Sequence, residues 1–217
     1  MLKDGILIIV NIRYKMCAIF GSYSLEKLRE LYELNKYRGE LAYSLAVFDL
    51  KNNTVKNKLF WSERKPFPED TWELLKEEKG YFLGHIQAPT TDTEEIQPSL
   101  FEGTMLWHNG IIKQKQLDEG EWDTRLLHKS YIKYGVKVLS DMDGSFACVY
   151  YNGNSLFAFR NEISPLFYDE NLNISSTQFE GSKPFNPNHV YQLGFYTGQL
   201  RSVGEFMTKE NPYFISE

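Results

Sequence analysis

Cysteine is the residue type in this sequence best suited to nucleophilic chemistry, and it occurs only at positions 17 and 148. A thiolate is a strong nucleophile toward amide and ester carbonyls. Cys148 lies in the apolar run 146–149, where its alternation with neighbouring apolar residues predicts a core position. Cys17 opens the short apolar run 18–21. By residue type it is either a small buried side chain at the start of a strand or a nucleophile.

Other polar residues also have two interpretations each. The pair Asn109-Gly110 could offer an amide and a backbone N–H to a developing oxyanion, but the same pair is common in hairpin turns. Asp123 could bind a cationic group or could cap a helix. The four histidines, at positions 85, 108, 128 and 189, lack the spacing of a metal site and are predicted to be structural. We therefore predict no metal and no cofactor.

Composition narrows the class of protein. The chain has 217 residues, of which 42% are apolar and 15% aromatic, and this is enough for one sizeable core. Its formal net charge is −5, with acidic and basic residues interspersed. Because no positive field would hold a phosphate backbone or an anionic bilayer, we predict neither a nucleic-acid nor a membrane partner.

The first sixteen residues superficially imitate a secretory signal. The apolar run Ile6 to Val10 is too short for one, and Tyr14, Lys15 and Met16 stand where a small-residue cleavage site would be needed. No later segment approaches the ~18 consecutive apolar residues of a membrane span. The sequence has only two cysteines and so no dense disulfide framework, and a cytoplasmic location is therefore expected.

Hydrophobic periodicity predicts strands that pair through short turns, with helices between strand groups. The strands are expected at 18–21, 45–49, 57–61, 81–87, 104–108, 145–151, 155–160 and 166–168, with weaker segments at 190–200. Helices are expected after Ser24, after Asp70 in a capping box with Glu73, and over 124–134 with Asp123 as N-cap. This pattern favours an α+β fold of antiparallel sheet covered by helices.

The run Met16-Cys17-Ala18-Ile19-Phe20-Gly21 resembles the opening of class II glutamine amidotransferases, the N-terminal nucleophile (Ntn) domains of asparagine synthetase and glucosamine-6-phosphate synthase. Further blocks follow in the family's order: 37–39 (Tyr-Arg-Gly), 84–85 (Gly-His), 97–98 (Gln-Pro), 108–110 (His-Asn-Gly), 123–124 (Asp-Thr), 144–147 (Gly-Ser-Phe-Ala), Arg160 and 165–166 (Pro-Leu). The resemblance covers residues 16 to about 200. It implies the Ntn hydrolase fold, a four-layer αββα sandwich of antiparallel sheets.

The resemblance also implies roles for individual residues. Cys17 would be the nucleophile, and its own α-amino group would be the base. Reference pKa values of ~7.7 to 8.0 for the amine and ~8.5 for the thiol allow that proton transfer near neutral pH. Asn109 and Gly110 would form the oxyanion hole. Asp123 would hold the substrate's α-ammonium group, Thr90 would contact its carboxylate, and Arg38 is interpreted as structural support.

One position departs from the family. Gln87 stands where the family has the arginine that grips the substrate's α-carboxylate, and it remains the candidate binding residue at this point. A neutral amide cannot replace a guanidinium without loss of a charge-assisted pair of about 1.5 to 3 kcal/mol. Leu41 and Ala42 also replace the family's Asp-Ser. Weaker glutamine affinity or a different substrate is expected.

An N-terminal nucleophile needs a free amine, so residues 1–16 are interpreted as a leader. They are either a propeptide or the result of a start assigned upstream of Met16, and we favour the second, with 17–217 as a single amidotransferase domain. Three functions follow. The first is a stand-alone glutaminase that gives glutamate and delivers ammonia to a separate acceptor enzyme. The others are an Ntn hydrolase of a related small amide and a degenerate, non-catalytic binding module.

Overall fold

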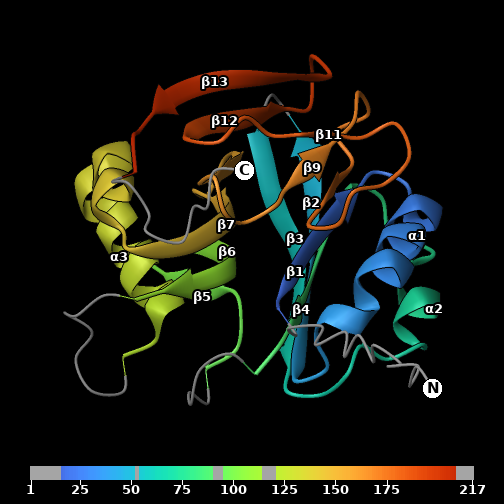
Figure 1. The fold of residues 1–217 in the computed structure, drawn as a ribbon. Coiled ribbons are helices and arrows are strands. Elements are labelled where there is room, and N and C mark those ends of the chain that lie inside the picture. Colours follow the sequence, from blue (N-terminus) through green and yellow to red (C-terminus); the bar gives the residue numbers. More distant parts are fainter. Residues whose placement is uncertain (1–15, 52–53, 90–94, 114–120, 209–217) are drawn as a thin grey trace, which may run out of the picture.

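The computed structural model describes residues 16–51, 54–89, 95–113 and 121–208. They form two sheets in which every described strand pair is antiparallel (Figure 1). The first sheet has the order β11 (Lys183–Pro184), β9 (Phe167–Tyr168), β10 (Ile174–Ser175), β1 (Ala18–Ser22), β4 (Tyr81–Gln87), β2 (Ala42–Lys51), β3 (Thr54–Glu63). The second has the order β13 (Gln199–Glu205), β12 (His189–Gly194), β8 (Leu156–Arg160), β7 (Gly144–Tyr151), β6 (Thr104–Ile112), β5 (Ser99–Phe101).

Helices cover the outer faces of both sheets. Helices α1 (Leu25–Asn35) and α2 (Thr71–Leu75) lie against the first sheet, and α3 (Asp123–Tyr134) lies against the second (Figure 1). Two 3-10 helices, η1 (Lys36–Arg38) and η2 (Gly135–Asp141), continue α1 and α3. The predicted α+β fold is confirmed, and the layers follow the αββα order of the Ntn hydrolase fold.

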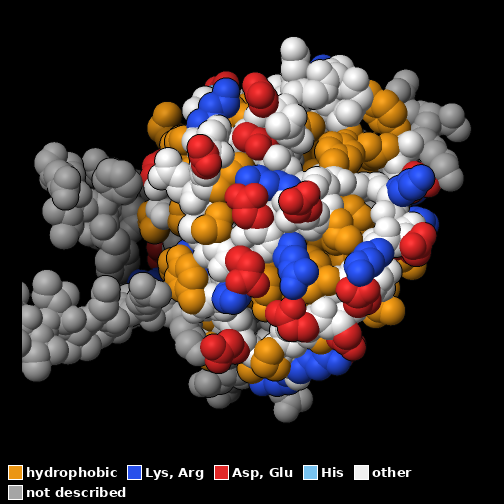
Figure 2. All heavy atoms as spheres, turned by 90° about the vertical axis from the view of Figure 1, so that its right-hand side faces the viewer, with side chains coloured by type: hydrophobic (Ala, Val, Ile, Leu, Met, Phe, Trp, Pro, Cys, Tyr) orange, Lys and Arg blue, Asp and Glu red, His pale blue; other side chains and the backbone are white. Residues whose placement is uncertain are grey.

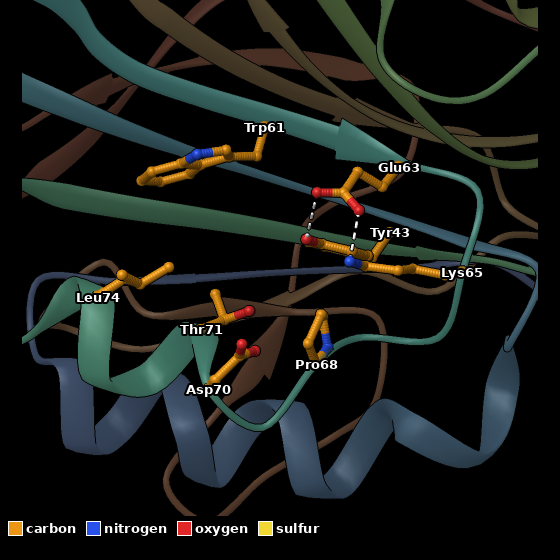
Figure 3. Close-up of a pocket in the computed structure, with 8 residues that line it drawn as sticks. All are labelled: Tyr43, Trp61, Glu63, Lys65, Pro68, Asp70, Thr71 and Leu74. Carbon is orange, nitrogen blue, oxygen red and sulfur yellow. Dashed lines mark hydrogen bonds and ion pairs between the residues drawn. The ribbon is translucent and has the colours of Figure 1, made fainter.

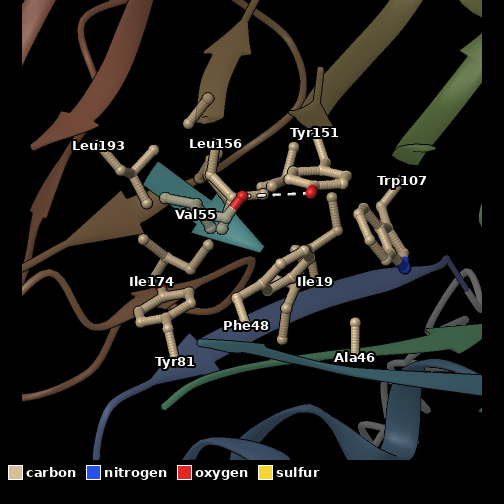
Figure 4. Close-up of a cluster of buried hydrophobic side chains, with 14 of the residues drawn as sticks. Ile19, Ala46, Phe48, Val55, Tyr81, Trp107, Tyr151, Leu156, Ile174 and Leu193 are labelled. Carbon is tan, nitrogen blue, oxygen red and sulfur yellow. Dashed lines mark hydrogen bonds between the residues drawn. The ribbon is translucent and has the colours of Figure 1, made fainter. Parts of the chain in front are cut away.

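The main core lies between the two sheets (Figure 4). Strand residues alternate between this core and an outer cluster, as the period of two requires. On β1, Ile19 faces the inter-sheet core and Phe20 faces α1. On β7, Ala147 faces the inter-sheet core and Cys148 faces α3. The predicted core position of Cys148 is confirmed by its complete burial.

The first helix begins as the sequence indicates. Ser24 is the N-cap of α1, and its hydroxyl accepts a hydrogen bond from the Lys27 N–H at 3.2 Å. Leu28 and Leu31 are fully buried against the first sheet. The hairpin formed by β2 and β3 is also confirmed, although both strands are longer than predicted and the turn at 52–53 lies outside the described residues.

One predicted helix cap is confirmed in position only, and another is wrong. Asp70 precedes α2 in αR conformation and makes no side-chain capping bond, so the predicted capping box with Glu73 does not form, and α2 has only five residues. A capping side chain needs a β-region backbone at the cap, which Asp70 lacks. At α3 the N-cap is Trp122, and Asp123 is already the first helical residue. The Asp123 carboxylate is thereby turned toward β6.

The face covered by α1 and α2 carries both signs of charge. Figure 2 shows Lys and Arg interspersed with Asp and Glu on this side of the molecule. Several of them form exposed ion pairs, such as Arg29 with Glu69 at 3.6 Å and Lys76 with Glu73 at 2.6 Å. Exposed pairs of this kind contribute little stability. Neither positive nor negative charge therefore dominates this face.

Within the described part of the chain, no helix is long and apolar enough to cross a membrane. Residues 1–15 of the predicted leader lie outside the described residues, and Met16 is the first residue that the structure places.

Candidate active site

Cys17 directly precedes β1 and is 3% exposed. Burial raises the pKa of its thiol to about 11, and the nearby Asp123 charge acts in the same direction. A hydrogen bond from the Ala88 backbone and the Arg38 charge oppose this rise in the pKa. The Arg38 Nε also donates to the Cys17 carbonyl at 3.2 Å. The thiol is therefore protonated at neutral pH, but it lies among polar groups.

The approach of η1 to the end of β4 depends on Gly39. A Cβ atom at this position would lie 2.5 Å from the carbonyl carbon of Gln87, which is too close for any side chain. The backbone N–H of Leu41 then donates to the Gln87 carbonyl at 2.9 Å. This close contact holds Arg38 beside Cys17, which explains the glycine in the Tyr37-Arg38-Gly39 block.

Asn109 lies in the middle of β6, opposite Ala147 of β7, and is 1% exposed. Its Nδ2 donates to the Ser176 hydroxyl at 3.4 Å, and its Oδ1 has no hydrogen-bond partner in the described part of the chain. The same Ser176 hydroxyl accepts from the Ile19 N–H at 3.0 Å. Ser176 therefore links the Asn109 amide to the strand that follows Cys17, while leaving that amide only loosely held.

Gly110 is next on β6 and has φ +151°. A Cβ atom there would come within 2.0 Å of the Ser145 carbonyl oxygen, so only glycine fits. Both Asn109 and Gly110 are strand residues paired with β7. The hairpin-turn interpretation of this pair is therefore wrong.

Asp123 is 5% exposed, and both of its carboxylate oxygens accept hydrogen bonds from neighbouring groups. Its Oδ2 accepts from the Ile112 N–H at 3.1 Å, and its Oδ1 accepts from the Thr124 N–H at 2.7 Å. These bonds fix α3 to the end of β6. Oδ1 also accepts from the Thr124 hydroxyl at 3.3 Å, so acceptor capacity for a further donor remains at Oδ2.

Sequence reasoning missed the role of Gln97. Its side-chain amide pairs with the backbone of His108, accepting from the N–H and donating to the carbonyl at 2.6 Å. His85 Nε2 also donates to that carbonyl at 3.3 Å, and burial lowers the pKa of His85 to about 3. These buried groups hold the peptide that precedes Asn109. The family block Gln97-Pro98 marked this residue in the sequence, but it did not indicate what the Gln97 side chain does.

Gln87 occupies the last position of β4, and both ends of its amide are in use. Its Nε2 donates to the Glu95 carbonyl at 3.1 Å, and its Oε1 accepts from the Gln97 N–H at 2.9 Å. The Gln87 side chain therefore links the end of β4 to the segment at residues 95–97. Thr90 lies outside the described residues.

Direct contact therefore joins Cys17 to Arg38 of η1, and the Ser176 hydroxyl links Asn109 of β6 to Ile19 of β1. Asp123 of α3 bonds to the end of the same strand β6. Gln87 adjoins this group through the Gly39 contact and the backbone of Ala88. No group of three or more His, Cys, Asp or Glu side chains among the described residues could hold a metal ion.

A separate hollow of about 130 Å³ lies between α2 and the β2–β3 hairpin (Figure 3). The Glu63 carboxylate in its wall pairs with Lys65 at 2.6 Å and accepts from the Tyr43 hydroxyl at 3.4 Å. Trp61 and Leu74 line the opposite part. None of the predicted site residues lines this hollow, so the chemistry considered below does not involve it.

Comparison with known proteins is informative at the level of structure only. The sequence matches no protein-family model, and it matches none of the curated proteins. Among solved structures, glutamine phosphoribosylpyrophosphate amidotransferase from B. subtilis, complexed with ADP and GMP, superposes with a TM-score of 0.62 at 16% identity. That match covers 86% of this chain and 49% of the other. The chain has the fold of a class II glutamine amidotransferase.

Two further structures agree with this result. A protein described as the allosteric regulatory enzyme of purine biosynthesis gives a TM-score of 0.59 at 17% identity, over 86% of this chain and 48% of that one. A glutamine aminotransferase class-II domain protein from Silicibacter pomeroyi gives 0.52 at 14% identity, over 88% and 99%. This chain spans about half the length of the first two proteins and nearly all of the third.

Proposed function

We propose that the protein is a class II glutamine amidotransferase that hydrolyses the side-chain amide of glutamine through the Cys17 thiolate. The observation that carries the proposal is the setting of Cys17. It is a buried thiol directly before β1, beside the Ala88 backbone and the Arg38 guanidinium. The Ser176 hydroxyl links the Asn109 amide to Ile19, two residues after Cys17. On this fold, these are the groups that amide hydrolysis needs.

The first step requires a base for the thiol. With a pKa of about 11, the Cys17 thiol holds its proton at neutral pH. Loss of Met1 to Met16 would create an α-amino group on the same residue, and an amine with a pKa of ~7.7 to 8.0 can accept that proton. Deprotonated sulfur then attacks the amide carbon of glutamine. Residues 1–16 would acylate the amine and prevent this step.

The next steps move the proton and break the amide bond. The tetrahedral oxyanion receives hydrogen bonds from the Asn109 side-chain amide and the Gly110 N–H. The protonated α-amine returns its proton to the leaving nitrogen, so ammonia departs and a thioester with Cys17 remains. Water, deprotonated by the same amine, hydrolyses the thioester and gives glutamate and the free thiol. No cofactor is consumed.

We further propose that the domain acts as a separate cytoplasmic protein and passes its ammonia to an acceptor enzyme. The near end-to-end match with the Silicibacter pomeroyi domain protein supports a separate existence for this fold. Asp123 is assigned to the α-ammonium group, because its carboxylate lies at the end of β6, the strand that carries Asn109, and its Oδ2 keeps an acceptor position.

A second candidate is an Ntn hydrolase acting on another small amide. It is favoured by Gln87, whose amide is occupied at both ends by loop backbone and adds no cation. A substrate without a carboxylate would not need a cation at this position.

Expression from the native gene, followed by intact-mass measurement and an ammonia-release assay with glutamine, tests the proposal. We expect a protein that begins at Cys17, releases ammonia from glutamine, and is labelled at Cys17 by 6-diazo-5-oxo-norleucine. Reactivity toward other amides alone would favour the second candidate. A protein that begins at Cys17 and reacts with neither amide nor label would instead be a non-catalytic binding module, and a retained leader would rule out the free-amine mechanism.

A further inference from the structure

The edge of β6 that faces away from β7 contacts three parts of the chain. In an antiparallel strand, alternate residues direct their backbone N–H and C=O groups to the same edge. On this edge β6 pairs with the three residues of β5, and the last pair joins Leu106 to Ser99. Farther along, Ile112 donates its N–H to the carboxylate of the first residue of α3 at 3.1 Å. His108 and Gly110 lie between these two contacts, beyond the end of β5.

Gln97 occupies the first of these positions with its side chain. The register of β5 and β6 would place residue 97 opposite His108. Its side-chain amide pairs there, because Oε1 accepts from the His108 N–H and Nε2 donates to the His108 carbonyl at 2.6 Å. A side-chain amide offers a donor and an acceptor, as a peptide group does, so Gln97 replaces a strand residue. Gln97 and His108 are 4% and 1% exposed, so water does not compete for these two hydrogen bonds.

The direction of the Asn109 side chain depends on this contact. Within the described part of the chain, its Nδ2 bonds to the Ser176 hydroxyl at 3.4 Å and its Oδ1 has no partner. A side chain held this weakly takes its direction mainly from the backbone, and the peptide that precedes Asn109 is the one that Gln97 binds. Gly110 follows directly, and its N–H falls on the same edge of β6 as that of His108.

We propose that Gln97 is a positioning residue of the oxyanion hole: its amide holds the peptide before Asn109 and thereby directs the Asn109 amide and the Gly110 N–H toward the oxyanion. This inference rests on the proposed amidotransferase function and adds a residue that acts through Asn109. It also gives a function to Gln87, whose Oε1 accepts from the Gln97 N–H at 2.9 Å. Gln87 then supports the oxyanion hole through Gln97.

Gln97→Met tests the proposal, because methionine has a similar size and removes both hydrogen bonds. Ammonia release from glutamine is measured with the protein in the N-terminal form that accumulates in cells. We expect kcat to fall about tenfold or more, with KM changed by less than about twofold. In the Asn109→Ala background the same substitution should lower kcat by less than about threefold, because the group that Gln97 positions is already absent. Two effects that simply multiply in the double variant would overturn the proposal.

Gln97→Glu adds the pH profile as a second readout. A protonated glutamate carries a donor and an acceptor, as glutamine does, whereas an ionised one cannot donate to the His108 carbonyl. Burial raises the pKa of a carboxyl above its reference value of ~4.3, so the ratio of kcat in Gln97→Glu to kcat in the wild type should rise from about pH 8 to about pH 6. A ratio that stays at the level of Gln97→Met throughout would contradict the proposal.

Asn173→Leu is the matched control, because it removes another buried side-chain amide, which donates to Asp169 at 2.7 Å in the turn between β9 and β10. It should lower the thermal unfolding temperature and leave kcat unchanged. A fall in kcat equal to that of Gln97→Met would show that lost stability explains both, and it would overturn the assignment, as would an unchanged kcat in Gln97→Met. Wild-type protein that releases no ammonia would instead refute the proposed function, and this inference with it.

Discussion

The two cysteines of this chain are both buried but lie in different surroundings. Burial raises the pKa of both thiols, and Asp123 raises it further in each case. Cys148 lies in a cluster with Leu106, Leu127 and Phe146, between the second sheet and α3. Cys17 lies at the start of a strand, beside the Ala88 backbone and the Arg38 guanidinium. Burial alone therefore does not distinguish a core thiol from a nucleophile, whereas the groups that contact the sulfur do.

Replacing each cysteine by alanine gives the largest expected difference. Cys17→Ala should lower glutaminase kcat by at least about 10³-fold, because the acyl-enzyme cannot form. Cys148→Ala should leave kcat unchanged and lower the free energy of unfolding by about 1 to 2 kcal/mol, because it opens a small cavity in a packed cluster. Steady-state ammonia release and urea unfolding measure the two effects. Substantial activity in Cys17→Ala would contradict the assignment of the nucleophile.

Two buried asparagines extend the same comparison. Among the described residues, Asn109 has one weak hydrogen bond and an Oδ1 without a partner, whereas the Asn161 side chain bonds to the backbone of Phe146, Ser164 and Gly144. Asn109→Ala should lower kcat by about 10²-fold or more, with little loss of stability. Asn161→Ala should instead cost about 1 to 3 kcal/mol of unfolding free energy.

Both asparagine variants are compared by kcat, KM and thermal unfolding. The contrast fails if Asn109→Ala unfolds as readily as Asn161→Ala, since Asn109 would then be a structural residue with no special relation to the oxyanion.

Local sequence patterns predicted those parts of the molecule that local physics determines. Apolar runs predicted β1, β4 and β7, and Ser24 marked the start of α1. The candidate roles of Cys17 and Asn109-Gly110 came from ordered motifs and stay predictions. Helix caps were less predictable, because the Asp70 cap depends on a backbone angle that residue type does not fix.

Contacts between residues far apart in sequence could not be predicted. The Gln97 amide pairs with the backbone of His108 only because the loop after β4 lies beside β6. The ion pair of Arg125 with Glu95 joins residues thirty positions apart. Neither pairing has a spacing or a composition that would indicate it. The same holds for Gln87, whose bonds to Glu95 and Gln97 require the folded loop.

Gln87 allows a sharper test of whether a polar residue beside the site is structural or contacts substrate. Gln87→Ala removes the partners of the Glu95 carbonyl and the Gln97 N–H, and should cost about 1 to 3 kcal/mol of unfolding free energy. Gln192→Ala is the control, because Gln192 is partly exposed and bonds to the Ser155 hydroxyl near the β12–β13 hairpin. It should be close to neutral. A raised KM for glutamine in Gln87→Ala, without loss of stability, would identify a substrate contact instead.

The smallest predicted effect concerns pH, where the buried histidines contrast with the two thiols. Burial lowers the pKa of His85 to about 3 and that of His128 to about 4. Between these values and the unfolded pKa of ~6.5, the unfolded chain binds protons that the folded chain does not, so stability falls as pH falls through this range. Both thiols stay protonated in folded and unfolded chains there, and they contribute nothing to the slope.

His128→Gln isolates one of these contributions. His128 bonds to the Ser99 and Thr104 hydroxyls, and a glutamine amide can replace at least one of those bonds. Because one fewer group titrates, the fall in unfolding free energy between about pH 6 and pH 4.5 should be shallower by up to about 1.4 kcal/mol per pH unit. Urea unfolding at a series of pH values measures both slopes. Equal slopes in the two proteins would mean that His128 is protonated in the folded chain, which the buried position and apolar neighbours of its ring argue against.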